Sequence, residues 1–185
     1  MTFDNPRIQE KLKEILGKPH ETVLHAVVPF DFGWDAGGAA DVYIYKNHID
    51  GVVYITGDLI GQEQQISDAG NYELMICHRT DTHWGPDLIS NLAFYTLDAS
   101  LKSGETMDLG GNFVLEDSKI TALIFDKYFG FQVDNINYGL MLLMGITRDE
   151  LDWKNKNGGT ALIEKLKEQK VYPFTDINRK SIFKT

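Results

Sequence analysis

Gly139-Leu-Met-Leu-Leu-Met-Gly-Ile146, followed at once by Thr147-Arg-Asp-Glu150, is the stretch that decides the fold. The apolar run is too short to span a membrane and predicts a buried strand. Thr147 and Glu150 have the capping-box spacing, in which each side chain accepts a hydrogen bond from the other residue's backbone amide. The stretch therefore predicts a core strand that leads directly into a capped helix.

Further helices are predicted on both sides of this stretch. Asn5 as cap and Pro6 at the first helical position begin a helix that Gly17 can end. Apolar residues recur at helical spacing over residues 86–101 and predict the main amphipathic helix. Beyond the capped helix, Gly158 and Gly159 precede a second helix that ends near residue 170.

The remaining pattern predicts strands and no repeats. Apolar and β-branched runs bounded by turn residues predict strands at 22–28, 40–45, 51–56, 72–79, 121–126 and 138–144, with a hairpin-like turn at 47–51. The strands cluster between helices at the two ends of the chain, and strands and helices do not alternate regularly. This order favours a mixed, largely antiparallel sheet flanked by helices. We therefore predict an α+β fold in one domain over residues 1–185, a length that suits a single core.

Several blocks of the sequence resemble the suppressor of fused family. They keep the family's order and lie between about residues 41 and 183: Val53-Tyr-Ile-Thr-Gly-Asp-Leu59, Tyr72-Glu-Leu-Met-Ile76, Trp84-Gly-Pro86, Leu88, Leu92, Ala93, Tyr95, Ser103-Gly-Glu105, Gly145-Ile-Thr147 and Glu150-Leu151. Animal members carry a second, C-terminal domain, whereas this chain resembles the stand-alone bacterial members.

The resemblance implies a binding protein rather than an enzyme. Many bacterial members resemble immunity or antitoxin proteins that occupy and neutralise a cognate toxin, for which a nuclease is a natural choice. The animal relatives instead imply a regulator that captures a short segment of a transcription factor by β-strand addition. A small metal-dependent hydrolase is a third hypothesis.

Charge is unevenly distributed along the chain, whose net charge is −9. Residues 31–150 hold 19 acidic and 6 basic residues, a net of −13, whereas residues 151–185 hold 4 acidic and 8 basic residues, a net of +4. An acidic field repels phosphate backbones, which argues against direct nucleic-acid binding. It would attract a basic toxin and speed the encounter, although an acidic balance also serves solubility.

The expected location is the cytoplasm. The first seven residues lack the apolar stretch of a signal peptide, and no run approaches the length of a membrane span. The single cysteine, Cys77, cannot form an internal disulfide, as suits a reducing compartment.

No catalytic residue, metal site or cofactor is predicted. Cys77, His78, Asp81 and His83 are close in sequence, but Cys77 and His78 point to opposite faces of a strand, and no second pair of metal ligands has a recognised spacing. A lone cysteine in an apolar strand is more often an inert core residue than a nucleophile.

Partner contacts are predicted in irregular, acidic segments. Exposed aromatic residues concentrate binding energy, so Trp34, in the segment 30–34, and Phe129, in an expected loop at 128–131, are candidate anchors. Tyr54, Tyr72, Trp84 and Tyr95 are predicted to pack. Acidic residues in predicted loops complete the expected contacts: Asp58, Glu63, Asp68, Asp81 and Asp87.

Overall fold

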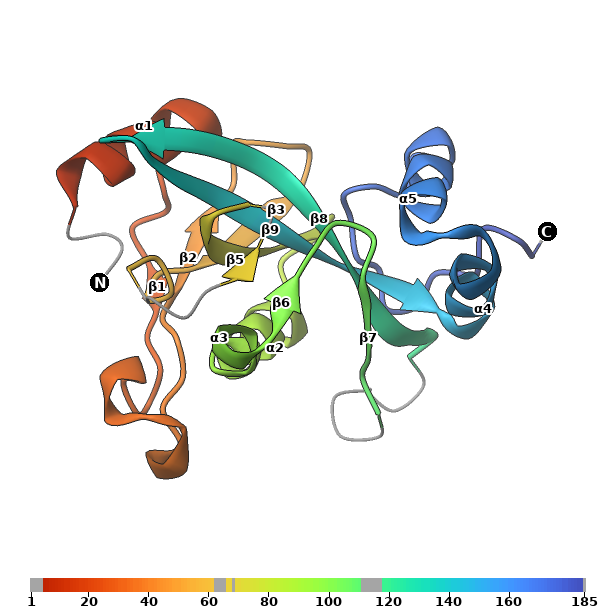
Figure 1. Cartoon of the computed structure of the whole chain (residues 1–185), viewed down its shortest axis with the longest axis horizontal. Helices are drawn as coiled ribbons and strands as arrows, with labels where there is room; N and C mark the ends of the chain where they lie inside the picture. Colours follow the sequence, from red (N-terminus) through yellow and green to blue (C-terminus); the bar gives the residue numbers. More distant parts are fainter. Residues whose placement is uncertain (1–4, 62–65, 68, 111–117, 185) are drawn as a thin grey trace.

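A seven-stranded sheet runs through the molecule (Figure 1), and the computed structural model describes residues 5–61, 66–67, 69–110 and 118–184. Neighbouring strands are antiparallel except β5 and β9, so the predicted mixed, largely antiparallel sheet is confirmed. The strands follow the order β1 (Val23–Leu24), β2 (Val42–Tyr45), β3 (Val52–Thr56), β5 (Asn71–His78), β9 (Ile136–Thr147), β8 (Ile120–Val133) and β7 (Thr106–Asp108). A separate parallel ladder joins β4 (Ile66–Ser67) to β6 (Ser100–Leu101).

Strand β9 lies between two hydrophobic layers, which explains its continuous apolar run. Leu140 and Leu142 contribute to the core on one face, and Met141 and Leu143 to the core on the other. The alternation follows from the two-residue period of a strand. Burial of both faces removes the polar positions that a solvent-exposed strand would show.

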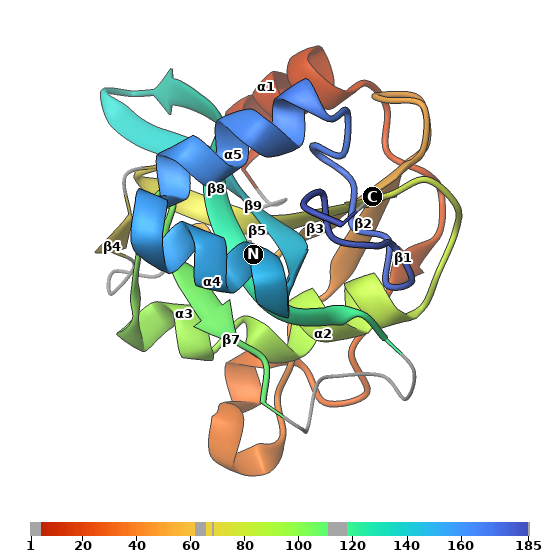
Figure 2. The ribbon, with the colours of Figure 1, turned by 90° about the vertical axis from the view of Figure 1, so that its right-hand side faces the viewer.

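Helices cover both faces of the sheet (Figure 2). Helix α1 (Pro6–Leu16) buries Ile8, Leu12 and Leu16, and its cap Asn5 accepts a hydrogen bond from the Arg7 amide, as predicted. Helices α4 (Arg148–Asn157) and α5 (Gly159–Glu168) pack further along the same face. Helices α2 (Trp84–Leu92) and α3 (Tyr95–Asp98) cover the opposite face.

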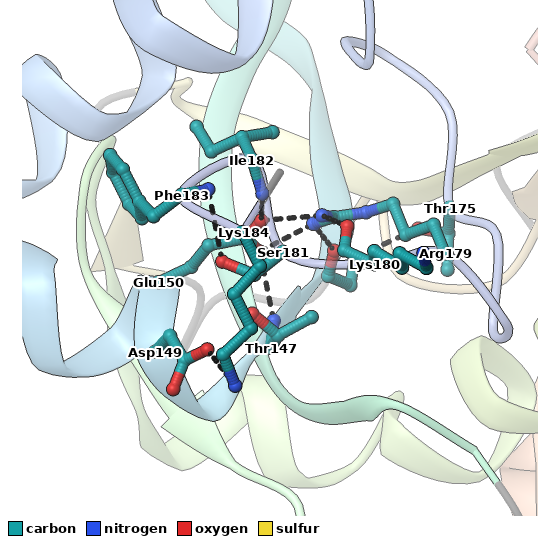
Figure 3. A network of polar contacts seen from close by, with 11 residues as sticks. Thr147, Asp149, Glu150, Thr175, Arg179, Lys180, Ser181, Ile182, Phe183 and Lys184 are labelled. Carbon is teal, nitrogen blue, oxygen red and sulfur yellow. Dashed lines mark hydrogen bonds and ion pairs between the residues drawn. The ribbon is translucent and has the colours of Figure 1, made fainter.

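A buried ion pair joins the end of β9, the start of α4 and the C-terminal segment (Figure 3). Glu150 is 0% exposed and the Arg179 side chain 9%. The two nitrogens of the Arg179 fork donate to the two Glu150 oxygens at 2.5 and 2.6 Å. The same carboxylate accepts the amides of Thr147 and Ile182, each at 2.9 Å. Because both oxygens are hydrogen-bonded, the buried charge is compensated.

The capping box predicted at the start of α4 is present. Glu150 accepts the Thr147 amide. The amide of Glu150 faces the Thr147 hydroxyl, but too loosely for a hydrogen bond, and that hydroxyl oxygen has no partner among the described residues.

The C-terminal segment is also tied to the centre of the sheet. Thr175 donates its amide to the Cys77 carbonyl, and its hydroxyl accepts the Gly145 amide, each at 2.8 Å. The Thr175 carbonyl lies 2.8 Å from Nδ1 of His78. A carbonyl can only accept, so Nδ1 carries the proton of a neutral imidazole. Burial lowers the pKa of His78, partly opposed by this hydrogen bond and by Asp176.

The loop predicted at 128–131 is wrong, because these residues belong to strand β8. Strands β8 and β9 are longer than the sequence predicts and form a hairpin that reaches Val133 and Ile136. Its two turn residues, Asp134 and Asn135, both have positive φ, as a two-residue hairpin turn of type I′ requires. Tyr128 is the extra residue of a bulge between Lys127 and Phe129.

The predicted helix over 86–101 is also wrong at its end. Helix α2 stops at Leu92, and the Thr96 hydroxyl donates to the Ala93 carbonyl at 2.7 Å, a local bond that competes with helical hydrogen bonding. Residues 100–101 pair with β4 instead.

Two further expectations are corrected. The strand expected at 22–28 covers only Val23–Leu24, because the Ala26 amide turns to the Asp41 carboxylate at 3.0 Å. Tyr95 was predicted to pack but is 54% exposed, whereas Tyr54 and Tyr72 are buried. Among the described segments, no helix is both long and apolar enough to cross a bilayer.

Glu150→Gln is expected to destabilise the fold strongly. It leaves the Arg179 guanidinium buried without a counter-charge, which costs on the order of 3–5 kcal/mol. Glu164→Gln is the matched control, because its partner Lys167 is exposed and such pairs contribute about 0–1 kcal/mol. Denaturant unfolding measures both, and equal small losses would contradict the role given to the buried pair.

The buried His78 predicts a loss of stability in acid. Its pKa is lowered in the folded state, so below a pH of about 6.5 the unfolded chain takes up a proton that the folded chain resists. The free energy of unfolding should therefore fall as the pH drops through 6.5, and less steeply in His78→Gln. Replacement of the exposed His83 by Gln controls for the loss of one histidine. Parallel pH profiles for wild type and His78→Gln would refute the assignment.

Candidate protein-binding surface

A projecting arm, residues 25–41, leaves the sheet between β1 and β2 (Figure 1). It contains two short 3₁₀ helices, Phe30–Phe32 and Trp34–Ala36. The arm presents two large apolar side chains to solvent: Phe32 is 70% and Trp34 72% exposed. Val27, near its base, is fully exposed. Exposed aromatic side chains on a projecting segment are typical of binding anchors.

The arm is held in shape by glycines and by one buried aromatic residue. Phe30 is buried and stacks on Phe94 with ring centroids 4.0 Å apart. Gly37 adopts the left-handed conformation at φ 78°. A Cβ on Gly38 would lie 2.9 Å from the carbonyl oxygens of Gly33 and Pro29, so only glycine lets the two limbs approach. These contacts set the shape of the arm and attach it to the body of the molecule.

A network of acidic residues supports the base of the arm. The Asp41 carboxylate pairs with Nδ1 of His25 at 2.7 Å and accepts the Ala26 amide. The Asp41 amide donates to the Asp58 carboxylate at 2.9 Å. Burial raises the pKa of Asp58, partly opposed by the hydrogen bond from the Asp41 amide, and the charges of Asp41 and Asp31 also raise it. Negative charge is thus concentrated where the arm meets the sheet.

A groove of about 310 Å³ separates the arm's base from helix α2. Its walls include Leu24, Val28 and Pro86, with His25 and Asp87 as charged or titratable groups. No lysine or arginine occurs between Lys18 and Lys46, so the arm itself carries no strongly basic side chain. The surface combines apolar anchors with acidic groups and fits a basic, partly apolar partner.

The predicted contact residues are distributed over several regions. Trp34 lies on the arm, and Asp58 supports its base. The prediction that Asp87 lies in a loop is wrong, because it belongs to the first turn of helix α2, where it lines the groove. Asp81 lies elsewhere, in contact with the Tyr54 hydroxyl and paired with Lys46 at 3.2 Å. Phe129 is 41% exposed on the β8–β9 hairpin. Glu63 and Asp68 lie outside the described residues.

Four residues of the surface were not predicted from the sequence. His25 and Asp41 are sixteen positions apart, and no local pattern signals their pairing. The acidic pair Asp31 and Asp35, interleaved with Phe32 and Trp34, was visible in the sequence and could have been named with the aromatic residues.

The residues considered for catalysis do not form a common site. Cys77 is buried, burial raises the pKa of its thiol, and it packs in the core beneath α1. His78 points to the opposite face, against Tyr54 and Trp84, as the strand period predicts. His83 is exposed. Within the described part of the chain, no three His, Cys, Asp or Glu side chains are grouped to hold a metal ion.

Comparison with solved structures shows the same fold in distant proteins. A candidate SUFU (suppressor of fused protein) homolog from Neisseria gonorrhoeae matches with a TM-score of 0.65 and 18% identity, covering 96% of each chain. A chain of the crystal structure of the Sufu–Fu complex matches with a TM-score of 0.71 and 13% identity, covering 95% of this chain and 89% of that one.

Drosophila Suppressor of Fused matches with a TM-score of 0.68 and 13% identity, and this chain spans 49% of its length. No curated protein sequence matches the chain. The family model for the suppressor of fused protein matches residues 40–180, most of the chain and all the sequence blocks on which the resemblance rests. The chain therefore belongs to the suppressor of fused (SUFU) family.

Proposed function

We propose that this protein is a non-catalytic binding module that captures a basic partner protein through the arm. In this proposal it is a cytoplasmic immunity or antitoxin protein, and the partner is a cognate toxin whose active surface it covers. A nuclease toxin fits well, because a surface that binds nucleic acid is basic. A family relative, Sufu, has been solved in complex with another protein, Fu, which supports protein binding as the activity.

The observation that carries the proposal is the ordered arm with exposed Phe32 and Trp34 flanked by Asp31 and Asp35. Rigid aromatic anchors lose little conformational entropy on binding and contribute most of an interface's energy. The acidic residues beside them would steer a basic partner and exclude acidic ones. Asp87 in the groove would extend the same contact.

A second candidate function is capture of an extended peptide by β-strand addition. Strand β7 covers β8 only at residues 122–124, and among the described residues only β9 pairs with the backbone of residues 129–133. A hollow of about 610 Å³ on the hairpin is lined by Phe131, Gln132 and Tyr138, together with Ala69 and Gly70. The unpaired edge of β8 suits an added strand.

The proposal is tested by capture of the partner protein, followed by a test of whether this protein rescues cells that express the partner. The tagged protein is used to isolate its partner from the native host, and the partner is then expressed with and without it. Growth that depends on co-expression supports the immunity role. A captured protein that is not toxic would contradict the immunity role, and only the protein-binding function would remain supported.

Phe32→Ala with Trp34→Ala is expected to weaken the complex by roughly 2 kcal/mol or more, mainly through faster dissociation, because truncated anchors leave a packed interface incomplete. Ile136→Ala, an exposed apolar residue on the hairpin, is the matched control and should change affinity by less than about 0.5 kcal/mol. Surface plasmon resonance with the isolated partner measures both. If Phe129→Ala weakens binding and the arm variant does not, strand addition at the hairpin replaces the arm.

Asp31→Asn with Asp35→Asn is expected to slow association several-fold at low salt, with little effect on dissociation. The wild-type association rate should fall as the Debye length shrinks from about 10 Å to about 3 Å, and the variant's should fall less. Asp152→Asn with Glu168→Gln removes the same charge from exposed positions of α4 and α5 as a control. If the association rate depends neither on salt nor on any of these substitutions, the acidic charge does not steer the partner and serves only solubility.

A further inference from the structure

A basic pocket of about 450 Å³ lies at the start of helix α4, toward the opposite end of the molecule from the arm (Figure 1). Lys119, Arg148, Lys180 and Lys184 line it, with Asp149 as the acidic residue of its lining. The pocket is thus strongly positive in a chain of net charge −9. Two of its lysines come from the basic C-terminal stretch, which the proposed binding function does not use.

The positive charges of the pocket are only partly compensated. Lys184 pairs with Asp149 at 2.5 Å, and Arg148 with Asp108 at 3.1 Å. These pairs are largely exposed and contribute little, so a ligand can replace them. Lys119 and Lys180 form no ion pair with any residue that the structure describes. The pocket therefore offers two ammonium groups, those of Lys119 and Lys180, that pair with none of the described acidic residues.

The hydroxyl of Thr147 is a buried donor that could bind an anion in the pocket. It lines the pocket, is 6% exposed, and its hydroxyl has no hydrogen-bond partner among the described residues. In the capping box the hydroxyl oxygen faces an amide, so even a closer contact there would leave the hydroxyl hydrogen without an acceptor. A buried donor left unpaired is unfavourable. An oxygen of a bound anion would satisfy it.

The backbone at this point also favours an anion. Helix α4 has ten residues, and the amides of its first turn point out of the helix without intrahelical partners. Glu150 accepts the Thr147 amide, whereas the amides of Arg148 and Asp149, the first two residues of the helix and part of the pocket lining, have no intrahelical partner. Together with the helix dipole they favour negative charge at this point.

We propose that this pocket binds a phosphate group, as inorganic phosphate or as the phosphoester of a small molecule. A phosphate group carries about −1.5 charge or more at neutral pH, which suits two lysines that lack a partner among the described acidic residues, and its several oxygens can accept from a hydroxyl and from amides together. A carboxylate has one charge and two oxygens and satisfies fewer of these groups. The acidic field of the rest of the chain opposes a nucleic-acid polymer, so the ligand is small.

Titration calorimetry in phosphate-free buffer at constant ionic strength tests the proposal, with inorganic phosphate, adenosine monophosphate and adenosine as separate ligands. Lys119→Gln with Lys180→Gln should weaken phosphate binding roughly tenfold or more, because it removes both charges from exposed positions. Lys13→Gln with Lys156→Gln makes the same charge change outside the pocket and should leave affinity within about twofold. Thr147→Val should weaken binding and Thr147→Ser should retain it.

Saturable binding of one phosphate per chain, with amide NMR shifts concentrated at residues 147–149, supports the proposal. If adenosine monophosphate binds more tightly than phosphate and adenosine does not bind, the proposal holds and the ligand is a phosphoester. If adenosine monophosphate and phosphate bind with equal affinity, the proposal holds and the ligand is phosphate itself. It is overturned if phosphate does not saturate, if adenosine binds as well as its monophosphate, or if the Lys119 and Lys180 variant binds like wild type. Because Lys119 and Lys180 are exposed, their replacement tests the site without removing a core contact.

Discussion

The buried pair of Glu150 and Arg179 is the interaction on which the rest of the structure depends. A carboxylate removed from water is tolerated only when its charge is balanced and its oxygens are hydrogen-bonded. Glu150 meets both conditions through Arg179 and the amides of Thr147 and Ile182. Because these groups come from the end of β9, the start of α4 and the C-terminal segment, one side chain fixes where all three meet. The basic pocket lies at the same junction. The C-terminal segment that the junction holds also contacts His78 through the Thr175 carbonyl.

The arm is held by a different kind of constraint. Its two limbs approach because Gly38 has no Cβ, and Phe30 fixes it to the molecule by stacking on Phe94. The aromatic residues that remain exposed are thus carried on an ordered segment, which lowers the entropy lost when a partner binds. The acidic residues around it lie far in sequence from one another, yet Asp41 and Asp58 meet because β2 and β3 are adjacent strands.

Much of the fold was predictable because its signals are local. The apolar run before Thr147 and the spacing to Glu150 predicted β9 and the start of α4, and Asn5 with Pro6 predicted α1. The β8–β9 hairpin was missed because its turn, Asp134 and Asn135, lacks the glycine that makes such turns conspicuous, and because Gly130 made a strand resemble a loop. Tyr95 was misjudged because α3 is a separate short helix rather than the continuation of α2.

The candidate surface was only partly predictable for the same reason. The irregular sequence around Trp34 indicated exposure, but the support from His25, Asp41 and Asp58 depends on strand pairing that no local pattern encodes. If the arm forms the contact with a basic protein partner, hydrogen–deuterium exchange of the protein alone and in complex with its isolated partner should show it. Exchange should slow at residues 25–41 and stay unchanged at residues 128–138. Slowed exchange confined to residues 128–138 would mean that the hairpin, and not the arm, forms the contact.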